Sequence, residues 1–320
     1  MRFSVTIRNR SSVKVGSIPI VDCHCHFLDA HLHTYPVFQQ RSPGFEALVG
    51  DYSALPRCYL PADYLRDANG FHVVKTVWAE FMSTDPNREV RWAETLSDEP
   101  GHPHGIIALV DFLSPAVERV LDSYASVRHV RAVRQHLAWH PSNPLMCFAT
   151  RPDILADKAW QAGLARLRNY NLRCEVEIFG SQLPDLKVVA NAYPDIQFVL
   201  PLMGWPIDLS RAGYRDWKRD MKELSGCNNV AVKIFGMECI FGLDWTIDQV
   251  RPWILETIEL FKPARCMFAS HMPIAKLACS FQDLYHGYLD VISGFSVSEK
   301  RKLFHDTANV IYGLTGLDQP

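Results

Sequence analysis

The sequence lacks the short motifs by which proteins commonly bind nucleotides or structural zinc. No Gly-x-Gly-x-x-Gly follows an apolar run and no Gly-x-x-x-x-Gly-Lys-Ser/Thr occurs, which excludes the dinucleotide and P-loop signatures. There are nine cysteines but no Cys-x-x-Cys pair, so the paired ligands of a structural zinc site are missing. An odd, scattered set of cysteines is typical of reduced thiols, and we expect a cytoplasmic protein.

Signals for a membrane or for nucleic acid are also missing. No apolar stretch reaches the length of about 18 residues that a membrane helix needs, and residues 1–17 have no continuous apolar segment of the secretory kind. The 33 basic and 35 acidic side chains nearly cancel, so no strongly basic surface is expected. We therefore expect a small-molecule substrate, no nucleic acid and no membrane as partners, and leave a homo-oligomer open.

What the chain does contain is a series of eight short apolar runs rich in β-branched residues. They cover residues 18–24, 73–79, 105–112, 129–137, 172–179, 196–202, 229–235 and 265–270. Continuous runs of this kind are typical of parallel strands that are buried on both faces. Between them lie amphipathic stretches, of which residues 151–170 and 244–261 place apolar side chains at helical spacing.

Eight strands alternating with helices predict an α/β fold, a (β/α)8 TIM barrel that forms a single domain over residues 1–320. A doubly wound sheet is the main rival. Residues 1–17 would be an N-terminal extension. Residues 27–60 are irregular and rich in His, Pro, Tyr and Gly. They follow the first predicted strand, where a barrel builds its active-site loops.

The first apolar run ends in two histidines, one residue apart, that could bind a metal ion. Residues 18–29 read IPIVDCHCHFLD. Successive strand residues face opposite sides, so His24 and His26 share one face while Cys23 and Cys25 share the other. We expect the two cysteines to pack as small apolar groups against the outer layer. Because neutral imidazole is a good metal ligand, His24 and His26 are candidate ligands at the strand end.

The ordered motifs resemble the amidohydrolase-2 branch of the amidohydrolase superfamily, in the group that holds sugar lactonases and pyrone-dicarboxylate lactonase. DCHCHF is similar to the family's first-strand Asp-x-His-x-His, and VRAVRQH to its fourth-strand element, with Arg134 in the arginine position. NVAVKIFGM resembles its seventh-strand element, with Lys233 as the lysine. GIIALVDF, QLPDLKVVANAYPDIQFVL and TANVIYGL resemble further elements. The matches extend over about residues 18 to 314.

Two motifs depart from the family. After the sixth strand the family commonly has Asp-His-x-Gly-Lys-Pro, whereas this chain has PLMGWP, with Leu202 in the histidine position and Trp205 in place of the lysine. After the eighth strand, Ser-Asp-Trp-Pro is replaced by SHMP, with His271 in the aspartate position. Leu202 would leave a second metal position unfilled. Trp205 favours a less anionic and more apolar substrate.

The resemblance implies hydrolysis of a lactone or a similar small carbonyl compound. In a metal-dependent version, His24, His26 and His271 would hold one divalent ion, zinc being the best match, and metal-bound water would attack the carbonyl. Glu175 or Glu177 would move the proton. Arg134 and Lys233 would hold a carboxylate or a developing oxyanion.

Other chemistries remain open at this stage. In a metal-free version the histidines would polarise the carbonyl and His271 would be the base, since imidazole titrates near neutral pH. Decarboxylation of an aromatic or unsaturated acid, isomerisation, and binding without hydrolysis also occur as alternatives on this fold. The departure at His271 does not decide among them.

Several further residues are candidates with a competing structural interpretation. Trp78, Trp139 and Trp205 lie at predicted strand ends and could form walls for a flat substrate, or pack in the core and on the rim. His31 is a candidate for substrate binding because it lies, with His33, in the loop after the first predicted strand. Glu177 could equally be an ion-paired barrel residue. The remaining histidines are expected at surface or hydrogen-bonded structural positions; they are His33, His72, His102, His104, His129, His136, His140, His286 and His305.

Overall fold

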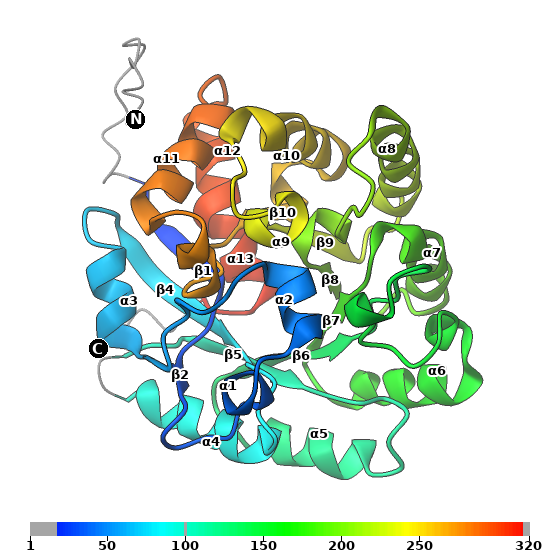
Figure 1. Ribbon diagram of the computed structural model, residues 1–320. Helices are drawn as coiled ribbons and strands as arrows, with labels where there is room; N and C mark the ends of the chain where they lie inside the picture. The colour runs from blue at the N-terminus through cyan, green and yellow to red at the C-terminus, as the bar shows by residue number, and fades with distance from the viewer. Residues whose placement is uncertain (1–17, 99–100, 316–320) are drawn as a thin grey trace.

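The computed structural model describes residues 18–98 and 101–315, so the predicted N-terminal extension lies outside the described residues. Eight parallel strands form one sheet in chain order, as Figure 1 shows. They are β1 (Ile20–Cys25), β4 (Val73–Ala79), β5 (Gly105–Leu109), β6 (Val130–His136), β7 (Arg173–Glu177), β8 (Phe198–Leu200), β9 (Val230–Ile234) and β10 (Cys266–Phe268). Seven of them lie within the predicted apolar runs, and β1 extends one residue beyond the run at 18–24, so the eight predicted strands are confirmed.

The sheet curls into a nearly closed barrel. The His271 backbone N–H donates to the His24 carbonyl oxygen at 2.8 Å, and the His26 N–H donates to the Met272 carbonyl oxygen at 2.7 Å. These bonds tie the segment after β10 to the end of β1. The predicted (β/α)8 class is therefore confirmed, and the doubly wound alternative is wrong.

Helices surround the barrel, and short helices lie over its mouth (Figure 1). The outer layer contains α3 (Pro61–Asp67), α4 (Pro86–Leu96), α5 (Val117–Ala125), α6 (Lys158–Ala165), α7 (Leu183–Ala192), α8 (Arg211–Ser225), α10 (Ile247–Phe261), α11 (Phe281–Val291), α12 (Val297–Arg301) and α13 (Thr307–Ile311). The predicted helix at 244–261 corresponds to α10. Its start is set by a capping box, in which Thr246 accepts from the Gln249 N–H and Gln249 accepts from the Thr246 N–H. The predicted helix at 151–170 is α6 between two 3₁₀ turns.

The segment after β1 folds over the barrel opening. It contains the antiparallel pair β2 (Leu28–Asp29) and β3 (Cys58–Tyr59), and the helices α1 (Pro36–Gln39) and α2 (Pro43–Val49). Ser42 caps α2 by accepting from the Phe45 N–H at 3.2 Å. In Figure 1, α2 lies in front of the strands near the centre of the barrel. This placement brings one face of α2 against the strand ends.

The described residues show where the two cysteines of β1 lie. Cys23 and Cys25 are fully buried, and their thiols lie 3.4 and 3.8 Å from the carbonyl oxygens of Phe268 and Val77 on the flanking strands. They pack away from the histidine face, as the strand alternation predicts. Among the helices of residues 18–98 and 101–315, none has both the length and the apolar character needed to cross a membrane.

Candidate active site

A pocket opens at the carboxyl ends of the strands, beneath α2. Its empty volume, including the part open to solvent, is about 460 Å³. The polar lining comes from strand ends and the segments that follow them, and consists of His26, Glu80, Arg134, His136, Glu177 and His271. The other lining residues are Phe45, Leu48, Val49, Phe81, Met82, Phe148, Leu202, Trp205, Cys239 and Ile274. A barrel keeps its active site at this end.

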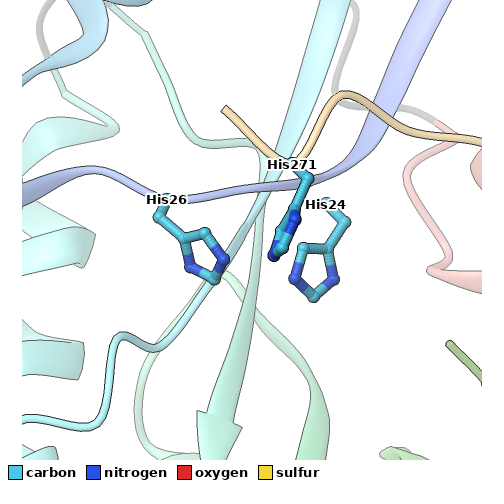
Figure 2. A group of neighbouring side chains, drawn as sticks. All are labelled: His24, His26 and His271. Carbon is cyan, nitrogen blue, oxygen red and sulfur yellow. The ribbon is translucent and has the colours of Figure 1, made fainter. Parts of the chain in front are cut away.

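Three histidines meet in and just below the pocket (Figure 2). The ring of His24 lies 5.0 Å from that of His26 and 5.4 Å from that of His271, and the rings of His26 and His271 are 5.3 Å apart. One nitrogen from each ring lies within 4.8 Å of the others. The structure thus brings together the three residues that the sequence analysis grouped as ligands.

His26 and His271 each have one ring nitrogen held and the other free. His26 Nδ1 donates to the Ala79 carbonyl oxygen at 2.9 Å, and its Nε2 is buried with no hydrogen-bond partner. His271 Nδ1 donates to Glu238 Oε1 at 2.5 Å. A histidine whose Nδ1–H is held in this way presents a lone pair on Nε2. Both residues therefore offer an acceptor nitrogen.

Glu238 reaches His271 because of a glycine turn. α9 (Met237–Phe241) follows β9 through Gly236, which has a φ of 73°. The positive φ favours glycine, and a Cβ at this position would lie 2.1 Å from Leu202 Cδ2 and force that side chain to move. The turn places Glu238, which is 2% exposed, directly behind His271. His271 itself has a φ of 59°, a strained conformation that is typical of functional sites.

His24 is held differently, because both of its ring nitrogens face cations. Lys233 Nζ lies 3.2 Å from Nδ1, and Arg134 Nη1 lies 3.4 Å from Nε2. A neutral imidazole has only one acceptor nitrogen, so His24 can accept a hydrogen bond from only one of these two cations at a time.

The pKa values of His24 and His26 favour the neutral forms of both rings. Burial, followed by the charge of Lys233, holds the pKa of His24 well below its usual value of 6.5. Burial, followed by His271, does the same for the pKa of His26. Both rings thus stay uncharged at neutral pH, and His26 Nε2 stays an acceptor.

The cluster could hold a metal ion, but its members fit unequally. The free Nε2 atoms of His26 and His271 suit zinc, and the Glu238–His271 pair has the form in which a carboxylate orients a ligand. His24 fits less well, because Lys233 and Arg134 each face one of its ring nitrogens. Glu238, Cys239 and His271 form a second such group, but it shares His271.

A buried ion-pair network forms the other polar side of the pocket. Arg134 Nη2 donates to Glu80 Oε1 at 2.6 Å and to the Glu80 carbonyl oxygen at 2.8 Å, and Nε donates to Oε1 at 2.9 Å. His136 bridges two carboxylates, with Nε2 2.8 Å from Glu80 and Nδ1 2.7 Å from Glu177. Arg134 Nη1 is 3.5 Å from Glu177. Two cations and two anions therefore balance.

The network sets the charge of its members. Burial opposes ionisation of both carboxyls, but Arg134 and His136 outweigh it and hold the pKa values of Glu80 and Glu177 below their usual values. Burial also opposes the charge on His136, but Glu177 and Glu80 outweigh it and raise the pKa of His136 to about 9. His136 is therefore an imidazolium at neutral pH.

This raised pKa predicts a pH dependence of stability. The stabilisation from charged His136 is fully present below pH 6.5 and is lost as the pH rises through about 9. A shift of this size corresponds to on the order of 3 kcal/mol. We expect the difference in unfolding free energy between wild type and His136→Gln, measured with urea, to shrink over this range. A pH-independent difference would contradict the assignment. His286→Gln, at an exposed position, is the control.

The structure places the other predicted site residues at different depths. Trp205, Arg134 and Glu177 line the pocket. Glu175 and Lys233 are fully buried below it, with Lys233 Nζ 2.7 Å from Glu175 Oε1, which also accepts from the Tyr312 hydroxyl at 2.5 Å. Neither lines the pocket. Within the described residues, this buried pair supports His24 from below.

The structure does not bring Trp78 and His31 to the pocket. Trp78 is fully buried and donates from Nε1 to the Phe27 carbonyl oxygen at 2.9 Å. His31 is exposed, on the loop that follows β2. Their positions correspond to the structural interpretations of core packing for Trp78 and a surface histidine for His31. Glu177 likewise occupies the ion-paired position given as its alternative.

Sequence reasoning missed three residues of the site. Glu80 and His136 were not singled out, although Glu80 directly follows β4 and His136 ends β6. A polar residue at the end of a barrel strand is the signal that would have found both. Glu238 left no such signal, because only the turn at Gly236 directs it toward His271.

The sequence of this chain is similar to those of known proteins. A family model described as Amidohydrolase matches residues 21–314. The uncharacterised protein y4mH of Sinorhizobium fredii is 32% identical over 301 residues, 93% of this chain and 99% of that protein. An L-fucono-1,5-lactonase of Burkholderia multivorans is 24% identical over 172 residues, 49% of this chain and 57% of that protein.

Solved structures show the same fold. An amidohydrolase from Burkholderia multivorans with bound zinc has a TM-score of 0.75 at 18% identity, over 92% of this chain and 99% of that one. A putative 2-pyrone-4,6-dicarboxylic acid hydrolase from Pseudomonas putida has a TM-score of 0.68 at 20% identity, over 92% and 98%. A 5-carboxyvanillate decarboxylase from Novosphingobium aromaticivorans with bound manganese has 0.62 at 14%, over 93% and 97%.

Proposed function

Because this chain belongs to the Amidohydrolase family, whose model it matches over residues 21–314, we propose that it is a hydrolase that opens a lactone. Water would attack the carbonyl carbon of the cyclic ester, and the product would be a hydroxy acid. The observation that carries the proposal is the pairing of two imidazole nitrogens, His26 Nε2 and His271 Nε2, with the guanidinium of Arg134 in one pocket.

The two acceptors suit an attacking water molecule. Their ring nitrogens lie within 4.8 Å of each other, so one water at hydrogen-bond distance, about 2.8 Å, can donate to both. His271 is the better base of the two, because the buried carboxylate of Glu238 stabilises the imidazolium that forms when Nε2 takes the proton. His26 then orients the water.

Arg134 has one nitrogen available for the carbonyl oxygen. Its Nε and Nη2 are committed to Glu80, whereas Nη1 has only long contacts, 3.4 Å to His24 and 3.5 Å to Glu177. Donors already fixed toward the developing negative charge are the main source of acceleration in acyl transfer. Collapse of the tetrahedral intermediate breaks the ring C–O bond, and the leaving oxygen takes its proton from His271.

A divalent ion is compatible with the same side chains. His26 and His271 would hold it through Nε2, and when bound it would lower the pKa of a water molecule and polarise the carbonyl. Transfer of the water proton to His271 requires the metal-free site, because only there is the lone pair on His271 Nε2 free to accept it.

Product analysis tests the proposed reaction. The purified chain is incubated with a panel of lactones and, separately, with a panel of aromatic carboxylic acids. We expect acid release from at least one lactone in a pH-stat and no carbon dioxide from either panel. Carbon dioxide release from an aromatic acid would instead identify a decarboxylase, which is the activity of one structural neighbour. Turnover of neither panel, with ligand-dependent stabilisation, would indicate binding alone.

Metal content gives a separate prediction. We expect at most one divalent ion per chain in protein purified without added metal or chelator, since Leu202 offers no ligand atom and His24 is engaged by Lys233. His26→Ala should weaken zinc binding at least about tenfold, measured by titration, whereas His286→Ala should not. Two ions per chain would contradict this arrangement.

A further inference from the structure

The polar side of the pocket has no cation to spare for an anionic substrate. The lining cations are Arg134 and His136, and each is paired with Glu80 and Glu177. Lys233, which does not line the pocket, is 0% exposed and paired with Glu175. Arg134 Nη1, the one nitrogen with only long contacts, receives the lactone carbonyl oxygen in the proposed reaction. A substrate carboxylate would therefore enter beside two existing carboxylates and lose its hydration without gaining a cation of its own. Burying an unpaired charge in this way is strongly unfavourable.

The rest of the pocket lining is largely apolar. α2 contributes Phe45, Leu48 and Val49, which are 7%, 6% and 4% exposed. Phe81 and Trp205, 2% and 4% exposed, continue the same surface. With Phe148, the pocket has four aromatic rings. Ring hydroxyls of a sugar lactone would face these walls without hydrogen-bond partners, which costs binding energy for each hydroxyl.

We infer that this site selects an uncharged lactone that carries an apolar aromatic or alkyl group, and that it discriminates against both carboxylated and polyhydroxylated lactones. The inference rests on the proposed lactone hydrolysis. The lactone carbonyl faces Arg134 and the histidines, and the apolar group lies against α2 and Trp205. The balanced ion pairs thus serve two purposes, because they fix Arg134 for the carbonyl and exclude a second anion.

Matched substrates test the selectivity. The kcat/KM of the wild-type chain is measured for a δ-lactone carrying a phenyl group, for the same lactone with a carboxylate at the para position of that phenyl, and for a sugar δ-lactone. We expect the phenyl lactone to be preferred over each of the others by a factor of about 100 or more. A preference for the carboxylated or the sugar lactone would overturn the inference and leave lactone hydrolysis standing.

A positive charge inserted among the apolar residues of α2 tests the cause of this selectivity. Leu48→Lys places an unpaired ammonium on α2, facing the pocket. This variant should lower the ratio of kcat/KM for the phenyl lactone to kcat/KM for the carboxyphenyl lactone by a factor of about 10 or more. Val188→Lys adds the same charge at a position 65% exposed on the outer helix α7 and should leave the ratio unchanged. An unchanged ratio in a folded Leu48→Lys protein would contradict the inference.

Binding of unreactive analogues separates this inference from the reaction. The lactams that correspond to the phenyl and carboxyphenyl lactones are tested by thermal stabilisation of the wild-type chain. We expect stabilisation by the phenyl lactam alone, at concentrations where the carboxylated lactam has no effect. If no lactone is hydrolysed but the phenyl lactam binds in this way, the proposed reaction fails and the selectivity stands. Equal or stronger binding of the carboxylated lactam, or no binding of the phenyl lactam, overturns it.

Discussion

Replacing His271 by alanine is expected to lower kcat for lactone hydrolysis by a factor of about 100 or more, the usual contribution of a general base. The reason is that His271 Nε2 is the acceptor that Glu238 supports from behind, through a 2.5 Å hydrogen bond to Nδ1. His26 Nε2 lacks a carboxylate behind it, so it is a poorer replacement. Steady-state rates on the best lactone of the panel measure the effect.

The control for this variant addresses folding. His271→Ala leaves Glu238 buried without its partner, so the double variant with Glu238→Gln is compared as well. Both variants should unfold cooperatively. Their kcat values for lactone hydrolysis should be equally low, because the Glu238 carboxylate acts only through His271. His286→Ala, on the exposed side of α11, should keep wild-type activity. Full activity in folded His271→Ala would make His271 a structural residue and move the search for the base to Glu177.

The second large effect is expected at Arg134. Arg134→Met removes one of the two cations that pair with Glu80, whose side chain is 0% exposed, and leaves His136 alone between Glu80 and Glu177. Breaking a buried pair by removing one partner commonly costs about 3–5 kcal/mol, and here the network is left with one uncompensated negative charge. We expect a loss of about 3–5 kcal/mol in unfolding free energy by urea denaturation, together with loss of hydrolysis.

A double-mutant cycle identifies the cause of that loss. Glu80→Gln in the Arg134→Met background removes the excess negative charge of the network, so the double variant should be more stable than the sum of the single changes predicts. His136 will keep Glu177 as a partner in every member of the cycle. Strict additivity of the two changes would show that the pair is not coupled and would contradict the network described above.

The eight strands could be predicted from sequence because continuous apolar, β-branched runs report burial on both faces directly. The depth at which each side chain lies in the barrel could not be predicted from the sequence. His24 and His26, Arg134 and His136, and Glu175 and Glu177 are pairs two residues apart, which share a face but belong to successive layers about 6.6 Å apart along the strand. Glu177 reaches the pocket, whereas Glu175 remains below it and pairs with Lys233.

The rest of the site depends on contacts between distant segments. Glu80 and Glu238 both lie just beyond strands, where sequence periodicity has ended and side-chain direction depends on turns. The protonation of His136 depends on two carboxylates from neighbouring strand ends. The apolar wall comes from α2, a seven-residue helix, in a segment whose composition indicated only an irregular loop. None of these contacts leaves a periodic signal in the sequence.

Hydrolysis in water enriched in the heavy oxygen isotope tests the central claim most directly. The phenyl-substituted δ-lactone is converted by the wild-type chain, and the hydroxy acid is analysed by mass spectrometry. Water attack on the carbonyl, with the proton taken by His271, predicts one heavy oxygen atom in the carboxylate and none in the hydroxyl group. Heavy oxygen in the hydroxyl group, or carbon dioxide in place of a hydroxy acid, would contradict the account.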